Sequence, residues 1–222
     1  MEYQYLLFDL DGTLTDPKEG ITRCFQYALE SFGIHAPEAD KLTWVIGPPL
    51  VDSFMEGYGF TLEQAKQGTA KYRERYTPIG WKENEAYPGI AQALRTLKEA
   101  GFILATATSK PEDMARKILE HFGLLEYFSF VGGASLDLSR CGKADVIRYT
   151  LDNLGVKDCG KVLMVGDRKY DVEGAKEFGI PCLGVLYGYG DREELTQAGA
   201  AALVEDTEEL CAWCMAHRAG GL

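Results

Sequence analysis

Two acidic residues follow the first apolar run of the sequence. Residues 5–8 are apolar or aromatic, and the chain then continues Asp9-Leu10-Asp11-Gly12-Thr13. Side chains two residues apart on a β-strand point to the same side, so the carboxylates of Asp9 and Asp11 are expected to face one way. Gly12 lets the backbone turn closely around a bound group. Because ligands bind at the carboxyl ends of the strands in open α/β sheets, the pair predicts a site there.

Three later segments place a hydroxyl, amine or carboxylate group at a predicted strand end or helix start. They carry Thr108 and Ser109, then Lys143, then Asp167 and Asp171. A phosphate monoester is a dianion that clustered carboxylates would repel, because two unit charges about 4 Å apart cost roughly 4 kcal/mol at an effective dielectric constant of 20. A phosphate site built on these residues needs a hard cation, and oxygen ligands favour Mg²⁺.

The four segments together resemble the ordered motifs of the haloacid dehalogenase-like hydrolases, in their phosphoglycolate phosphatase-like and 5'-nucleotidase-like branch. The matching segments are 9–13, 107–111, 142–145 and 166–171. They occur in the family's order, and the resemblance covers essentially the whole chain. It implies an enzyme, a phosphoric monoester hydrolase that uses Mg²⁺ and forms an aspartyl-phosphate.

The resemblance also implies a role for each residue. Asp9 is the nucleophile, and Asp11 is the acid that protonates the leaving oxygen and later the base for water. Thr108, the backbone at Ser109 and Lys143 are expected to hold the phosphate. The carboxylates of Asp9 and Asp167 and the backbone carbonyl of Asp11 are expected to bind Mg²⁺, with Asp171 in a supporting role. Lys110 is a candidate for a supporting contact, and its role is open.

Several other functions are compatible with parts of this pattern. Dehalogenases of the family lack the acid at the position of Asp11, which argues against them. A receiver module has similar residues, but it needs only about 120 residues and no helical insertion. A binding protein without activity is disfavoured because no motif residue is missing. A sugar-phosphate phosphomutase on the same scaffold remains the alternative, and the sequence does not separate phosphoglycolate from a 5'-nucleotide as substrate.

The elements that position these residues alternate along the chain. Short apolar runs at 5–8, 102–107, 128–131, 162–165 and 182–185 are typical of parallel strands buried on both faces. Helical patterns that begin near a proline and end at a glycine lie between most of them. The pattern predicts an α/β fold with a doubly wound, mostly parallel sheet, a Rossmann-like core formed by residues 1–17 and 86–222.

One long interval carries only helical patterns. Residues 18–85 are too many for a loop between two strands, so they predict an inserted all-α domain. Thr61 and Gln64 form a capping-box pattern at one of its helix starts. By the resemblance, this segment is a cap that selects the leaving group.

Composition limits the remaining possibilities. The 222 residues carry a formal net charge of −11, which argues against binding to a nucleic-acid polymer. No apolar run approaches the roughly 18–20 residues of a membrane span, and residues 1–5 lack signal-peptide features, so a cytoplasmic protein with no membrane partner is expected. The expected partner is a small-molecule phosphate ester, and the oligomeric state is open.

Two motifs are set aside. Cys211, Cys214 and His217 offer only three zinc ligands close together, so reduced thiols are the simpler interpretation for all six cysteines. Gly188-Tyr189-Gly190 lacks the third glycine of a dinucleotide-binding motif and predicts a loop.

Overall fold

The computed structural model describes residues 2–137 and 139–220. The chain divides into two units, one formed by Met1–Thr15 with Ala86–Leu222 and the other by Asp16–Glu85. The short segments β2 (Thr15–Asp16) and β3 (Glu85–Ala86), where the chain passes between the units, form a two-stranded sheet. The sequence pattern did not predict these two strands, because two residues are too few to show a period.

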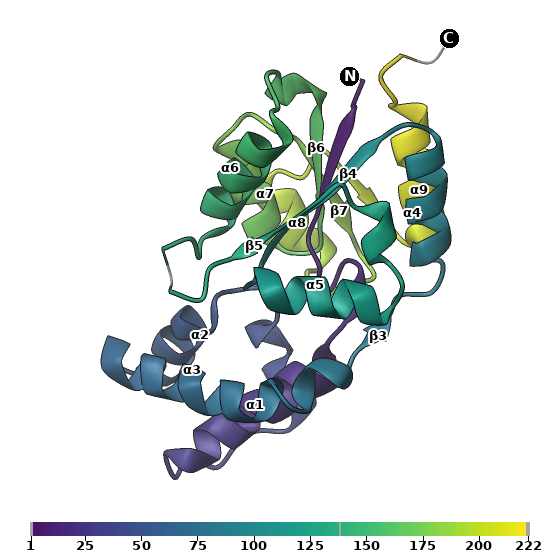
Figure 1. Cartoon of the computed structure of the whole chain (residues 1–222). Helices are drawn as coiled ribbons and strands as arrows, with labels where there is room; N and C mark the ends of the chain where they lie inside the picture. Colours follow the sequence, from purple (N-terminus) through teal and green to yellow (C-terminus); the bar gives the residue numbers. More distant parts are fainter. Residues whose placement is uncertain (1, 138, 221–222) are drawn as a thin grey trace. The chain divides into compact units, whose positions relative to one another are not determined.

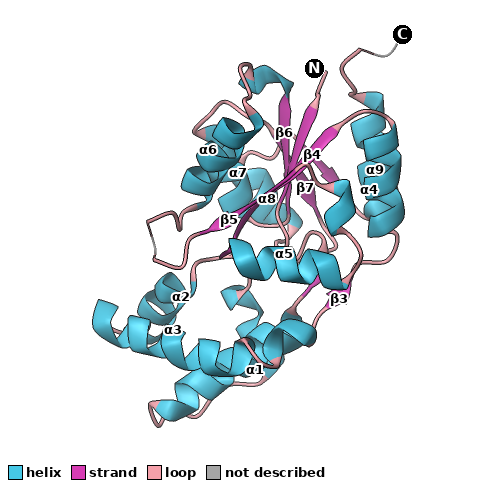
Figure 2. Ribbon diagram, viewed as in Figure 1, coloured by secondary structure: helices cyan, strands magenta, loops and turns pink. Residues whose placement is uncertain are grey.

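The first unit is an α/β domain built on a six-stranded parallel sheet (Figures 1 and 2). Its strands are β1 (Tyr5–Phe8), β4 (Ile103–Pro111), β5 (Phe130–Ala134), β6 (Val162–Gly166), β7 (Cys182–Val185) and β8 (Ala202–Val204). Its helices are α4 (Ile90–Glu99), α5 (Glu112–His121), α6 (Lys143–Leu154), α7 (Lys169–Lys176), α8 (Arg192–Ala198) and α9 (Thr207–Ala216). Helices α4 and α9 pack together on one face of the sheet, and α6 and α7 pack together on the other (Figure 2). The α/β fold with a doubly wound, Rossmann-like sheet is therefore confirmed.

The strand order β5-β4-β1-β6-β7-β8 explains why the strands read as apolar runs. Strand β1 lies at the centre and pairs in parallel with β4 and β6. All residues of β6 are buried, as expected for a strand covered by helices on both faces. Strand β5 begins two residues later than the apolar run 128–131 suggested, and edge strand β8 was not predicted from its three residues.

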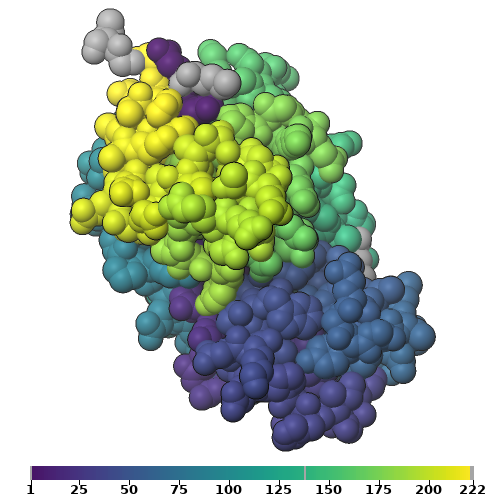
Figure 3. Space-filling view, turned by 180° about the vertical axis from the view of Figure 1, so that it is seen from behind, coloured from purple at the N-terminus to yellow at the C-terminus, as the bar shows by residue number. Residues whose placement is uncertain are grey.

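The beginning and the end of the described chain lie side by side. Tyr3 forms an isolated parallel bridge with Arg218, and its amide donates to the carbonyl of His217. Its ring stacks on Trp213 of α9. Figure 3 shows the purple N-terminal segment emerging beside the yellow C-terminal one. In the same region a nitrogen of the His217 ring lies 2.8 Å from the carbonyl oxygen of Trp213, and Cys214 is a buried free thiol.

The second unit is helical. It contains α1 (Lys18–Ser31), α2 (Leu50–Tyr58) and α3 (Leu62–Tyr76), with the 3₁₀ turns Ala39–Val45 and Gly80–Lys82. Stacked aromatic rings form its core, with Phe25 and Phe54 at a centroid distance of 4.4 Å. The predicted capping box is present, because Thr61 Oγ1 accepts from the Gln64 amide and the Gln64 side chain accepts from the Thr61 amide.

None of the described helices is both long enough and apolar enough to cross a lipid bilayer.

Candidate active site

The parallel strands bring the candidate residues together at one end of the sheet, where the carboxyl ends of the strands lie. Phe8, the last residue of β1, is in register with Thr106 of β4 and Val165 of β6. Asp9 therefore leaves the sheet between the end of β4 and the loop that carries Asp167. The chain reverses its winding direction between β5 and β6, which makes this end the topological switch point where α/β sheets bind ligands.

Lys143 lies between two carboxylates. Its Nζ atom is 3.0 Å from Asp9 Oδ1 and 2.7 Å from Asp171 Oδ1, and it donates to the carbonyl of Ala107 at 3.1 Å. The lysine side chain is 5% exposed, so these contacts form out of water. Burial lowers the pKa of Lys143, but Asp171 and Asp9 outweigh burial, and the net pKa is higher than that of a free lysine. Lys143 thus places an ammonium group between two carboxylates of the acidic cluster, and these carboxylates favour its charged form.

Asp11 has a separate partner, although it lies only two residues from Asp9. Its Oδ2 atom accepts from Lys110 Nζ at 2.6 Å, and both side chains are buried. Its Oδ1 atom is also buried and has no hydrogen-bond partner among the described residues. Burial raises the pKa of Asp11, and the positive charge of Lys110 only partly opposes this effect. A carboxyl group in this setting is suited to carry a proton.

Asp167 is held through both of its carboxylate oxygens. Thr13 Oγ1 donates to Oδ1 at 3.1 Å, and the Tyr189 amide donates to Oδ2 at 2.8 Å. Gly12, at φ +87°, lies so close that an added Cβ would be 2.1 Å from Asp167 Oδ2. The glycine of the first motif is therefore needed both for its backbone conformation and for the space that it leaves to Asp167.

The carboxylates of Asp9, Asp167 and Asp171 form one buried group. Each offers an oxygen atom, and these atoms lie within 4.8 Å of one another. Burial raises the pKa of Asp167 well above its usual range, and Asp171 and Asp9 raise it further. Burial also raises the pKa of Asp171, to about 6, while Lys143 opposes the shift.

The charges of this region fit a divalent cation. Together with Asp11 the site holds four carboxylates, and Lys110 and Lys143 form ion pairs with three of them. Full ionisation of these groups leaves a formal excess of two negative charges over the two lysines in a buried space. Burial, and after it the neighbouring carboxylates, raise the pKa of Asp167 and of Asp171. A cation such as Mg²⁺, which prefers oxygen ligands, would neutralise that excess.

The candidate phosphate-binding residues lie at the end of β4. Thr108 is buried, and its Oγ1 atom accepts from the Lys110 amide at 3.2 Å, which shapes the turn after the strand. Ser109 is half-buried. The contact of Lys143 with Ala107 attaches this turn to the start of α6.

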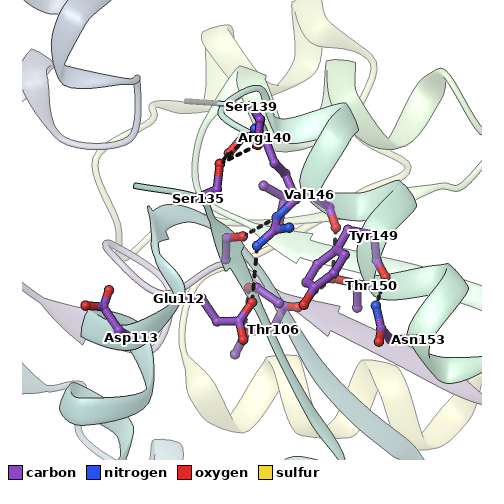
Figure 4. Close-up of polar contacts among 12 residues, drawn as sticks. Thr106, Glu112, Asp113, Ser135, Ser139, Arg140, Val146, Tyr149, Thr150 and Asn153 are labelled. Atoms are coloured by element: carbon purple, nitrogen blue, oxygen red, sulfur yellow. Dashed lines mark hydrogen bonds and ion pairs between the residues drawn. The ribbon is translucent and has the colours of Figure 1, made fainter. Parts of the chain in front are cut away.

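Arg140 holds the loop that leads into Lys143 (Figure 4). Its Nε atom donates to the carbonyl of Gly133 at 2.8 Å, and its Nη2 atom lies 3.3 Å from Glu112 Oε2. The guanidinium group stacks on the ring of Tyr149, with 3.6 Å between its Cζ atom and the ring centroid. The loop before α6 is thereby attached to β5, to α5 and to the side chain of Tyr149 in α6.

Each predicted site residue has a defined place at this end of the sheet, and their roles remain predictions. Two contacts were not visible in the sequence. Lys110 pairs with Asp11 across 99 positions, and Tyr189 reaches Asp167 across 22. Lys110 did lie within a recognised motif, as a candidate for a supporting contact, whereas the loop at Tyr189 gave no signal beyond its glycines.

Known proteins resemble this chain over nearly all of its length. The family model described as haloacid dehalogenase-like hydrolase matches residues 6–185. A 5'-nucleotidase of Pseudomonas aeruginosa is 44% identical over 195 residues, with 88% of each chain covered. Tyrosine-protein kinase PtkA of Mycobacterium tuberculosis is 40% identical over 212 residues, 93% of this chain and 72% of the relative. A phosphoglycolate phosphatase of Rhodospirillum rubrum is 32% identical over 228 residues, with 97% of this chain and 92% of the relative covered.

Solved structures agree with this result. The crystal structure of a predicted phosphatase from Clostridium acetobutylicum has a TM-score of 0.95 and 44% identity, and the match covers 97% of this chain and all of that one. The match to the family model spans all four motifs of the site. The chain therefore belongs to the haloacid dehalogenase-like hydrolase family.

Proposed function

We propose that this protein is a Mg²⁺-dependent phosphatase that hydrolyses a small phosphate monoester through an aspartyl-phosphate on Asp9. The observation that carries the proposal is the buried cluster of Asp9, Asp167 and Asp171 around Lys143. In this cluster the carboxylate of Asp9 lies at the end of the central strand β1. The cluster also carries an excess of negative charge, which a divalent cation would neutralise. In this proposal the chain is a phosphoric monoester hydrolase. Relatives named 5'-nucleotidase, probable phosphatase IndB and phosphoglycolate phosphatase support this class.

The side chains divide the chemistry between them. Asp9 attacks phosphorus, and Lys143, which lies 3.0 Å from Asp9 Oδ1, supplies positive charge to the transferring group. Asp11 gives its proton to the leaving oxygen and afterwards takes one from the attacking water. Thr108 and the Ser109 backbone hold phosphate oxygens. Mg²⁺, when bound by Asp9, Asp167 and the carbonyl of Asp11, would offset the repulsion between the carboxylates and the phosphate dianion.

The substrate class follows from the named relatives. A 5'-nucleotide and phosphoglycolate are the two candidates, because a 5'-nucleotidase and a phosphoglycolate phosphatase are both similar over nearly the whole chain. A phosphohexose tests the phosphomutase alternative, since a mutase returns an isomeric sugar phosphate instead of inorganic phosphate. ATP with a tyrosine-containing acceptor peptide belongs in the same screen, because one relative is named a tyrosine-protein kinase.

The test is a screen of the full chain with Mg²⁺ over these compounds. It measures inorganic phosphate from the esters, isomeric sugar phosphate from the phosphohexose and phosphopeptide from ATP with the peptide. Asp9→Asn preserves the shape of the side chain but removes the nucleophile, so we expect less than about a hundredth of the wild-type rate. Asp152→Asn is the matched control, because Asp152 is an exposed residue of α6. Phosphate from a labelled substrate should become attached to the wild type in a form that hydroxylamine releases. Hydrolysis that survives Asp9→Asn, or the absence of release from every ester, would contradict the proposal.

A further inference from the structure

The loop between β7 and α8 packs directly against Asp167. The Tyr189 amide donates to Asp167 Oδ2 at 2.8 Å. An added Cβ on Gly188 would lie 2.3 Å from Asp167 Cβ, and one on Gly190 would lie 2.0 Å from the Asp167 carbonyl oxygen. Side chains are therefore excluded at both glycines by Asp167 itself. The motif Gly188-Tyr189-Gly190, which the sequence analysis assigned to an ordinary loop, is shaped to this aspartate.

The helix that follows the loop holds the residues after Asp167. Glu194 Oε1 accepts from the Lys169 amide at 2.9 Å and from Arg168 Nε at 2.8 Å. Glu194 lies in the first turn of α8, where the Asp191 side chain accepts from its amide at 2.8 Å. The carboxylate of Glu194 therefore faces the segment after Asp167, while the cap of α8 is made by another residue.

A third contact connects the same loop to the first motif. The hydroxyl of Tyr187 donates to the carbonyl of Thr13 at 3.0 Å, and Thr13 Oγ1 donates to Asp167 Oδ1 at 3.1 Å. Asp167 thus has one oxygen held from the loop after β1 and the other from the loop after β7. Its carboxylate plane is set by two segments that lie far from it in sequence.

We propose that Gly188, Tyr189, Gly190 and Glu194 form a metal-site brace, a positioning element that fixes the orientation of the Asp167 carboxylate and thereby sets the affinity of the site for a divalent cation. The brace residues are positioning residues and do not take part in the chemistry. The inference rests on the proposed function, because it needs Asp167 to be a metal ligand.

The physical reason is the burial of Asp167 among like charges. Asp167 is fully buried and belongs to the group of three carboxylates within 4.8 Å. Without fixed donors on both oxygens, the Asp167 carboxylate would lower its electrostatic repulsion with Asp9 and Asp171 by turning away from them. The Tyr189 amide of the brace and Thr13 Oγ1 of the loop after β1 hold the carboxylate toward Asp9 and Asp171, so a cation meets ligands that are already oriented. Partners that orient metal ligands in this way typically contribute ten- to a hundredfold in metal affinity.

The test is calorimetric titration of the folded, metal-free full chain with Mg²⁺, together with steady-state kinetics over a range of Mg²⁺ concentrations. Glu194→Ala removes the hydrogen bonds that this carboxylate accepts from the Lys169 amide and from Arg168 Nε and Nη2. We expect the Kd for Mg²⁺ to rise by about ten- to a hundredfold. Glu194→Gln keeps one acceptor oxygen and should restore part of that loss. At saturating Mg²⁺, kcat of both variants should return to within about threefold of wild type, since the brace affects metal binding and not the chemical step.

Gly190→Ala tests the loop itself and should weaken Mg²⁺ binding at least as much. Its matched control is Gly20→Ala, because an added Cβ on Gly20 would lie 2.1 Å from a backbone carbonyl oxygen, that of Gly80, in the helical unit. Glu193→Gln is the control for Glu194, because Glu193 is exposed and its side chain accepts from Gln197, a residue of the same helix, at 2.9 Å. Both controls should leave the Mg²⁺ affinity unchanged even where they lower stability.

The outcomes separate this inference from the proposed function. A wild-type chain that binds no Mg²⁺ would overturn the metal site and the brace together. A wild type that binds Mg²⁺, with a folded Glu194→Ala variant whose Kd lies within about twofold of it, would overturn the brace alone. Glu194 is a half-buried residue near the surface, so its variants keep the test open even if Gly190→Ala does not fold.

Discussion

Replacing Lys143 by methionine tests whether this lysine neutralises the acidic cluster. Methionine keeps much of the length and apolar stem of the side chain but removes the ammonium group. That group lies 2.7 Å from Asp171 Oδ1 and 3.0 Å from Asp9 Oδ1, and its side chain is 5% exposed. The substitution therefore leaves the buried carboxylates of Asp9 and Asp171 close together without the positive charge that lies between them and offsets their repulsion.

The magnitude follows from these distances. At an effective dielectric constant of about 20, the gross attraction of unit charges is about 6 kcal/mol at the shorter contact and about 5.5 kcal/mol at the longer one. Removal of the lysine also removes the cost of burying its charge, which is several kcal/mol. Breaking a buried pair by removing one partner costs about 3–5 kcal/mol in measured cases. We expect a loss of this size in the free energy of unfolding of Lys143→Met at pH 8 without metal.

The loss should depend on pH in a defined direction. Burial already raises the pKa of Asp171 to about 6, and Lys143 opposes that shift, so the pKa rises further in the variant. An acid with a raised pKa in the folded state stabilises the fold when it is protonated, and that contribution is lost as the pH rises through the folded-state pKa. The difference between wild type and Lys143→Met should therefore be smaller at pH 5 than at pH 8.

Urea denaturation in EDTA at both pH values measures this difference. The matched control is Lys157→Met, because Lys157 is an exposed residue just after α6 and its loss should change stability by less than about 0.5 kcal/mol. A loss below about 1 kcal/mol for Lys143→Met at pH 8, or the same loss at both pH values, would refute the reasoning that this lysine neutralises Asp9 and Asp171.

Three further predictions address the chemistry and the metal. Asp11→Asn should slow the hydrolysis of alkyl phosphates by roughly 10²–10⁴-fold but affect the first step with p-nitrophenyl phosphate much less, because nitrophenolate leaves without a proton; rapid-quench kinetics with both substrates measures this, and equal slowing would contradict a proton donor. Exhaustive EDTA treatment should abolish turnover and Mg²⁺ should restore it, so full activity in metal-free buffer would exclude a metal requirement. Gly12→Ala should lower Mg²⁺ affinity and activity at least tenfold, because its Cβ would lie 2.1 Å from Asp167 Oδ2 at a φ of +87°. Calorimetric titration with Mg²⁺ measures the effect. An unchanged Kd would show that Asp167 can move without loss of metal affinity.

The sequence predicted those features that follow from local patterns. Strands such as β6 are apolar throughout because helices cover both faces of the sheet, and a continuous apolar run is the direct sign of that burial. The capping box at Thr61 is equally local, since its two partners lie three residues apart. The clustering of Asp9 with Asp167 also follows from the sequence, once the strands are known to be parallel and their carboxyl ends to share an edge.

Features that depend on the final packing were not predictable in the same way. Strand β8 is short and lies at the edge of the sheet, so its pattern does not stand out from a loop. The glycines at 188 and 190 indicate only that these two positions do not accommodate a side chain. The reason is the position of Asp167, more than twenty residues earlier in the chain, and no local pattern encodes it. Glu194 carries no sequence signal of its own, although its carboxylate binds Arg168.

The two aspartates of the first motif have the same residue type and nearly the same place in the chain, yet the fold gives them different partners. Asp9 joins Asp167 and Asp171 in the cluster that fits a cation. Asp11 pairs instead with Lys110 and keeps one buried oxygen without a donor among the described residues. Burial raises the pKa of Asp11, which suits this carboxyl group to hold a proton, whereas Asp9 Oδ1 lies 3.0 Å from the ammonium group of Lys143. The separate lysines, one from the end of β4 and one from the start of α6, thus support the assignment of different tasks to two acids that lie only two residues apart.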